Sequence, residues 1–198
     1  TISKGTKQIP KSLDSVIESM YQDVTKLNDN SMEAWIRYGD WCHYQANKDL
    51  KHISDKGIDL TAIEQSTLRE IVSKSSGIND EELNKLIKDV QDQLLTRVGE
   101  GHIDDEALEE AQDVSLRNQI AKNFALLCPA TTTQQTEEFI GFWSQLRTRA
   151  LAPLARAVVA YQRALQLSPS VLTSSVLCSA LRLLRIVTQW GRDVHPTP

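Results

Sequence analysis

The side chains of this chain that could support acid–base or metal chemistry are scattered rather than clustered. None of its histidines occur at the helical spacing of a metal-binding pair; they are His43, His52, His102 and His195. The segment Gly101-His102-Ile103-Asp104-Asp105 combines a base with two acids, but acids here are also typical of a helix's first turn. We interpret it as a helix entry, so the sequence predicts no metal site.

Paired carboxylates and nucleotide-binding motifs indicate no active site either. Glu109-Glu110 and Glu137-Glu138 fall on expected helical surfaces, whereas acid–base catalysis requires carboxylates in a cleft with shifted pKa values. The chain has no glycine-rich phosphate loop, no His-Arg-Asp catalytic loop and no Asp-Phe-Gly motif. The sequence therefore predicts no catalytic residues in this segment.

Charge is distributed unevenly within a net charge of −4. Residues 139–198 contain seven arginines and one acid, Asp193, whereas residues 1–138 have an excess of acids. The arginines could contact phosphate or an acidic partner, or they could pair with the acidic part of the chain or be solvated. We favour pairing or solvation, and the candidates for polyphosphate binding are Arg182 and Arg185. The four tryptophans fall on apolar stripes, so we expect core positions and no direct nucleic-acid binding.

The cysteines and the ends of the chain bear on its cellular context. Cys42, Cys128 and Cys178 are far apart and are interpreted as small core residues, which fits a reducing compartment and a cytoplasmic or nuclear location. No stretch approaches about 18 apolar residues, so no membrane contact is expected. The chain begins at Thr1 without a methionine and ends in a polar tail, which suggests a piece of a larger protein.

Apolar periodicity and capping residues predict seven helices and no strand. The expected segments are about 11–27, 31–47, from Thr61, from Asn79, from Asp104 or Asp105, about 136–167, and from Ser168-Pro169. Pro153 predicts that the sixth helix is kinked or split. The first helix could serve as a polar cap on a helical stack. The last is apolar over most of its girth, which predicts burial between neighbours.

Two distant stretches carry parts of the tetratricopeptide-repeat pattern, in which small residues admit a neighbouring helix. The repeat positions are Trp35, Tyr38 and Gly39 in the first helix of the pattern, and Ala157, Tyr161, Ala164 and Pro169 in the second. A tandem repeat needs about 34 residues, so either a long insertion splits one unit or the halves belong to different units. Chance matches within an ordinary helical bundle are the remaining alternative.

The expected fold is therefore all-α, an irregular α-solenoid of tetratricopeptide-like helix pairs with a long helical insertion. We treat residues 1–198 as a single helical segment. Its parts are a first repeat-like helix pair at 11–47, an acidic helical insertion at 48–131, closing helices at 132–194 and a tail at 195–198.

The stretch from Ala34 to Trp41, followed by a long insertion, resembles the FAT region of the phosphatidylinositol-3-kinase-related protein kinases. The closing stretch from Ala180 to Val187, with Trp190-Gly191, resembles it too. Within that family both are most similar to the SMG-type kinases of nonsense-mediated mRNA decay. The resemblance covers the two ends, whereas residues 48–128 match only in their acidic helical character.

The resemblance implies a segment that clamps the kinase domain of a serine/threonine protein kinase, with ATP and magnesium bound only in that domain. Implied partners are the rest of the parent chain and regulatory subunits. Relatives hold an inositol polyphosphate in a basic pocket of this region. Such pockets usually include lysines and no lysine follows Lys122, so no ligand residues are transferred. The alternatives are an independent tetratricopeptide-like adaptor for a protein partner, which needs a polar helix at each end, and a polyphosphate or nucleic-acid binder that uses the arginines.

Overall fold

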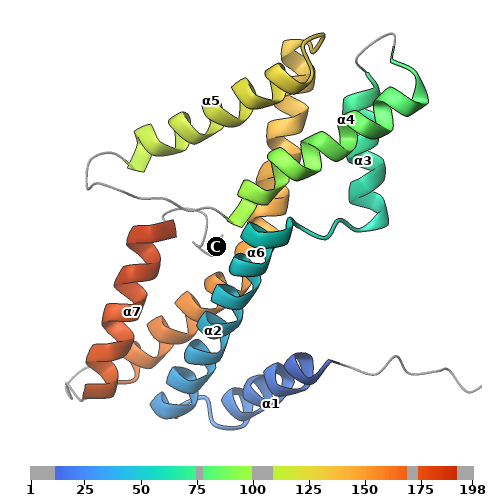
Figure 1. Cartoon of the computed structure of the whole chain (residues 1–198). Coiled ribbons are helices and arrows are strands. Elements are labelled where there is room, and N and C mark those ends of the chain that lie inside the picture. The colour runs from blue at the N-terminus through green and yellow to red at the C-terminus, as the bar shows by residue number, and fades with distance from the viewer. Residues whose placement is uncertain (1–11, 75–77, 100–108, 169–173, 191–198) are drawn as a thin grey trace, which may run out of the picture.

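The computed structural model describes residues 12–74, 78–99, 109–168 and 174–190. Within these ranges all regular secondary structure is helical, without a strand, which confirms the all-α prediction (Figure 1). The elements are α1 (Leu13–Leu27), α2 (Met32–Lys56), α3 (Ala62–Ser73), α4 (Asp80–Gln93), the 3-10 helix η1 (Leu95–Gly99), α5 (Glu109–Leu127), α6 (Thr133–Gln166) and α7 (Ser174–Trp190). No helix in the described ranges is long and apolar enough to cross a membrane.

The fold is organised around α2 and α6, which share the most extensive interface of any two elements. They run antiparallel, with α1 against α2 and α7 against α6 at one end (Figure 1). At the other end, α3, η1 and α5 contact α6, and α4 packs on α3, η1 and α5. One hydrophobic core runs through both ends, because buried residues of α2 and α6 contribute to each.

Helix α2 is longer than the sequence analysis predicted. It continues to Lys56 instead of ending near Asn47, so the expected boundary between residues 47 and 48 lies inside a helix. Ala46, Leu50 and Ile53 are buried at helical spacing and extend the apolar face that includes Cys42. The helix ends where Gly57 adopts φ = 84°, a left-handed conformation that glycine reaches without strain.

Side-chain caps fix the starts of three later helices. Thr61 and Asn79 each form a capping box with the glutamate three residues on, as their spacing predicts. Thr132 forms a third box with Gln135, so α6 begins at Thr133 and not at about residue 136 as predicted. The predicted starts at Asp104 or Asp105 and at Pro169 lie outside the described residues.

Two helices have an interruption in or next to them. Helix α4 ends at Gln93, and η1 follows. Helix α6 passes through Pro153 without splitting, so of the two predicted forms a split is excluded and a kink stays a prediction. Proline removes one backbone hydrogen bond, but Leu151, Leu154 and Val158 are buried on both sides of it, and this burial holds the helix together.

Core predictions for single residues are borne out in part. Cys42 and Cys128 are buried, and desolvation raises the pKa of the Cys128 thiol to about 11. Cys178 is exposed, because it lies on the side of α7 that faces away from α6, so its core assignment is wrong. Trp143 and Trp190 are buried, whereas Trp35 and Trp41 are half-buried.

Candidate functional site

Helices α2 and α6 approach each other closely at Gly39. A Cβ atom on this glycine would lie 2.7 Å from Cε1 and 2.8 Å from Cδ1 of Tyr161, whose side chain is fully buried. Ala157 and Ala164, one turn away on either side of Tyr161, are buried as well. The structure thus brings the two halves of the repeat pattern into contact across the intervening helices; Pro169 lies outside the described residues.

A polar network ties α7 to this contact. The Tyr161 hydroxyl donates to Asp40 Oδ1 at 2.8 Å, and Nη1 of Arg182 pairs with the same oxygen. Burial and the neighbouring Asp40 raise the pKa of Tyr161, so its hydroxyl stays protonated and acts as a donor. Asp40, which lies on α2, therefore binds one residue from α6 and one from α7 and connects the three helices.

His43 lies one turn beyond Asp40 on α2. Burial lowers the pKa of this imidazole, and the positive charges of Arg182 and Arg185 lower it further, against an opposing effect of Asp40. The group therefore favours its neutral form in the folded chain.

Arg147 connects α6, η1 and α7 at a second point. Its guanidinium carbon lies 5.5 Å from the Trp143 ring centroid and 5.4 Å from that of Trp190. Its Nη1 donates to the Val98 carbonyl at 3.3 Å. A buried arginine that contacts two aromatic rings and a carbonyl stabilises packing rather than binding a ligand.

Most of the arginines after residue 138 pair with acids from residues 1–138, which is the alternative that we favoured. Arg149 Nε lies 3.2 Å from Glu64, and Arg163 Nη2 lies 2.7 Å from Asp29. Arg156 Nε lies 3.0 Å from Glu18, although its N–H is not directed at the carboxylate. Of the two polyphosphate candidates, Arg182 is engaged by Asp40, and exposed Arg185 has no ion-pair partner among the described residues.

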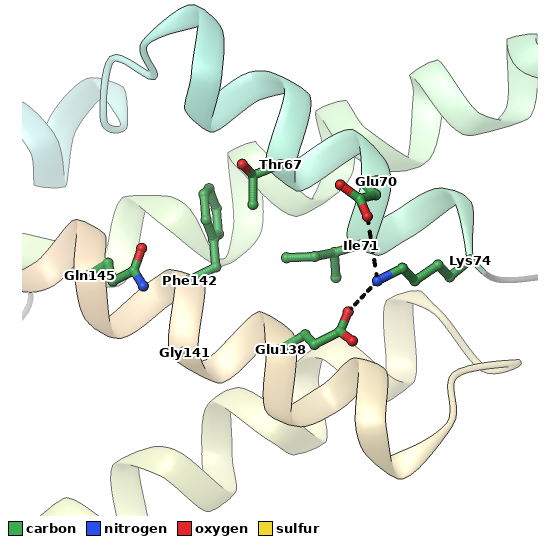
Figure 2. Close-up of a pocket in the computed structure, with 8 residues that line it drawn as sticks. All are labelled: Thr67, Glu70, Ile71, Lys74, Glu138, Gly141, Phe142 and Gln145. Atoms are coloured by element: carbon green, nitrogen blue, oxygen red, sulfur yellow. Dashed lines mark hydrogen bonds and ion pairs between the residues drawn. The ribbon is translucent and has the colours of Figure 1, made fainter.

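A groove between α3 and α6 was not anticipated from the sequence. Its volume is 260 Å³, and its walls are Thr67, Glu70, Ile71 and Lys74 from α3 with Glu138, Gly141, Phe142 and Gln145 from α6 (Figure 2). A Cβ atom added at Gly141 would meet no atom within 4 Å, so this part of the groove is open. A glycine inside an apolar helical stretch was the signal that could have pointed to it.

The charged rim of this groove is unsuited to acid–base catalysis. Lys74 Nζ lies 2.7 Å from Glu138 and 3.7 Å from Glu70. The hydrogen bond between Lys74 and Glu138 raises the pKa of the lysine and lowers that of the glutamate. Both groups therefore stay charged near neutral pH, which makes the lysine a poor base and the glutamate a poor acid.

Helix α1 exposes an apolar stripe that its neighbours do not cover. The α1 stripe consists of Leu13, Val16, Met20, Val24 and Leu27, each 40% to 88% exposed. The helix instead docks through polar and aromatic side chains: Gln22 donates to the Tyr38 hydroxyl, and Tyr21 stacks on Trp41. The expectation of a polar outer face on this helix is therefore wrong.

Helix α7 exposes a second apolar stripe. Val176, Ile186 and Trp190 are buried against the α2–α6 pair, so only one side of the helix is covered. The α7 stripe consists of Leu177, Leu181 and Leu184, each 48% to 62% exposed. The expected burial of α7 between neighbours is met on one face only.

The contacts described above connect the helices to one another. Within the described ranges, no group of three or more His, Cys, Asp or Glu side chains is placed to hold a metal ion. No protein-family model, curated protein or solved structure matches the chain.

Proposed function

We propose that the chain is a non-catalytic helical scaffold segment of a large serine/threonine protein kinase of nonsense-mediated mRNA decay. In this role it clamps and supports the kinase domain as part of a FAT region. The observation that carries the proposal is the contact of Gly39 with Tyr161. It joins the two halves of a tetratricopeptide-like pattern into one antiparallel helix pair.

The arrangement of the other elements supports the same proposal. Helices α3, α4 and α5 enter the chain between the two halves of the pair, as an insertion into one repeat-like unit would. The α1 and α7 stripes are apolar surfaces on which further helices of an irregular solenoid can stack. A helical segment whose apolar faces remain uncovered is suited to packing against more of its parent.

Under this proposal the chemistry takes place elsewhere in the parent protein. ATP and magnesium bind in the kinase domain, and the partners of this segment are the rest of the parent chain and regulatory subunits. The location is cytoplasmic or nuclear. An inositol polyphosphate would have to use Arg185, since Arg182 is held by Asp40.

Transcript sequence downstream of the Pro198 codon tests the proposal. We expect the reading frame to continue into a kinase domain with the His-Arg-Asp and Asp-Phe-Gly motifs that this chain lacks. A reading frame that closes soon after Pro198, or that continues into a domain of another class, overturns the proposal.

The α3–α6 groove favours a second function, an independent adaptor that binds a protein partner. Its floor of Ile71 and Phe142 with a charged rim is suited to a short segment bearing an apolar side chain. Gly141→Leu would fill the open part of the groove. An adaptor loses its partner in this variant, whereas a scaffold acting through α1 and α7 keeps its assembly.

A further inference from the structure

The two exposed stripes lie on opposite flanks of the central helix pair. Helix α1 contacts α2, α7 contacts α6, and Figure 1 shows the two outer helices on either side of the α2–α6 pair. Each stripe covers at least two helical turns. A partner on one flank therefore leaves the other flank accessible.

The stripes differ in the charge that accompanies them. Helix α1 carries Asp14, Glu18, Asp23 and Lys26, whereas α7 carries Arg182 and Arg185 and no acid. Several of these charges already have partners within the chain: Asp14 pairs with Lys48, Glu18 with Arg156, and Arg182 with Asp40.

The charges that remain beside the stripes are opposite in sign. Helical spacing places Asp23 next to Met20 and Leu27, and Arg185 next to Leu181. Both are exposed and have no ion-pair partner among the described residues. Lys26 lies on a different side of α1, away from the stripe.

We propose that the α1 stripe of one copy of this chain docks on the α7 stripe of a second copy, in a head-to-tail contact. Apolar side chains of both helices are removed from water, and Asp23 of one copy comes near Arg185 of the other. Such a contact is heterologous, so each added copy leaves one free α1 and one free α7, and assembly continues past a dimer into a ring or a filament.

Charge decides between this arrangement and symmetric pairing. An α7–α7 contact would place Arg185 of one copy near Arg185 of the other. An α1–α1 contact would likewise bring the two Asp23 side chains together. Like charges at an interface oppose association, whereas the α1–α7 contact matches acid with base. The scaffold role places helices of the parent on these two stripes, whereas the head-to-tail contact forms where the stripes are uncovered, and it depends on no kinase.

Sedimentation velocity on face-specific variants tests the inference. The wild-type chain should show an average mass that rises with concentration past that of a dimer. Val16→Glu with Met20→Glu blocks the α1 face, and Leu181→Glu blocks the α7 face; each should weaken self-association by at least about tenfold. An equimolar mixture of the two should form a dimer that grows no further, because only one intact pair of faces remains.

Matched controls place one added charge on the same helices away from the stripes. Ser19 and Ser175 are exposed, so the Ser19→Glu and Ser175→Glu variants should associate as the wild type does. Far-UV circular dichroism checks that every variant keeps its helices. Asp23→Arg and Arg185→Glu provide a second test on exposed residues: each alone should weaken association, and the two combined in one chain should restore it.

Three results overturn the inference. They are a wild-type chain that stays monomeric at every concentration, a single-face variant that still dimerises alone, and a variant mixture that gives no dimer. None of these results bears on whether the reading frame continues into a kinase domain. A missing kinase domain, conversely, leaves the head-to-tail contact intact, so the two proposals fail separately.

Discussion

At the scale of the residue, the contact between Gly39 and the Tyr161 ring sets how closely α2 and α6 approach. The ring cannot move aside easily, because it is fully buried and its hydroxyl is bonded to Asp40. Added volume in a close-packed core forces side chains off their rotamers or moves the backbone. The glycine is required by this packing and not by its backbone conformation, since only Gly57 has positive φ among the described glycines.

We predict that Gly39→Ala destabilises the fold by about 1–3 kcal/mol, the usual cost of overpacking a core. The matched control is Gly141→Ala, also inside a helix, where a new Cβ would meet no atom within 4 Å. Because alanine favours helix more than glycine does, this control should stabilise by about 0.5–1 kcal/mol. Urea unfolding measures both, and equal effects of the two substitutions would contradict the argument.

His43 should make the stability of the fold depend on pH. Its pKa in the folded chain lies below the ordinary value of 6.5, so the unfolded chain binds the proton more readily. This contribution to stability is present above pH 6.5 and is lost as the pH falls through the lowered pKa. His43→Gln should therefore flatten the dependence of the free energy of unfolding on pH in this acidic window.

Arg185→Gln tests whether the positive charge of Arg185 contributes to the lowered pKa of His43. Removing an exposed positive charge that lowers the pKa of His43 should move that pKa back toward its ordinary value, which the histidine proton resonances report in an NMR titration. An unchanged titration of His43 would show that the charge of Arg185 does not contribute to the shift.

The sequence indicated some of these residues and not others. Gly39 and Tyr161 could be predicted, because a small residue and an aromatic at repeat positions have a defined packing role. Exposed Cys178 could not, since helix α7 is apolar on both sides and its sequence does not show which side meets α6. Gly141 marks a small residue in an apolar stretch, but the open space above it also depends on the path of α3, which the residues around Gly141 do not show.

At the scale of the element, α7 is held to the pair by Asp40 at one point and by Arg147 at another. The guanidinium of Arg147 lies between two tryptophans, one of which, Trp190, ends α7. A planar guanidinium can contact both rings and a carbonyl at once, whereas an ammonium group cannot. Lysine is therefore not a conservative replacement at this position.

We predict that Arg147→Lys destabilises the fold by about 1–3 kcal/mol, because cation–π contacts of a buried cation are lost. Amide hydrogen exchange in α7 should accelerate most, since the helix loses one of its attachments. Arg149→Lys is the control two residues away: its exposed pair with Glu64 should contribute less than about 1 kcal/mol. Equal exchange rates in α7 for both variants would contradict this role.

Helix ends could be predicted where a side-chain cap fixes them and not where tertiary burial extends the helix. Thr61 and Asn79 have capping-box partners at the right spacing, and both boxes form. Residues after Asn47 look polar, yet Leu50 and Ile53 are buried against distant elements, so α2 continues. Gln135 closes the box at the start of α6, in a stretch whose composition is typical of a loop.

At the scale of the whole molecule, residues far apart in sequence make the decisive contacts. Tyr161 and Asp40 are bonded across 121 positions, which periodicity within one helix cannot show. Composition indicated that acidic and basic parts could pair, and the ion pairs of Arg149 and Arg163 confirm it. The outward orientation of the α1 stripe could not be predicted, because an apolar stripe ordinarily faces the core.

The continuous core predicts that the insertion does not unfold on its own. Buried residues of α3, α4, η1 and α5 form one cluster with those of α2, α6 and α7; Leu68, Val90, Phe124, Phe139 and Trp190 belong to it. Because α2 and α6 contribute buried side chains to both ends, neither end can lose its packing without disturbing the other. Helix α1 is the exception, since only Thr25 is buried there.

We therefore predict a single cooperative unfolding transition. Far-UV circular dichroism and the fluorescence of Trp143 and Trp190, isolated in a Trp35→Phe/Trp41→Phe variant, should give the same urea midpoint. Gly39→Ala in that background should lower both midpoints equally, although the substitution lies at the opposite end of the α2–α6 pair from the insertion. Hydrogen exchange in α1 should be faster than in α2 or α6. Two separated transitions would show that residues 58–131 form an independent unit, and the α2–α6 pair would then be an assembly of two parts.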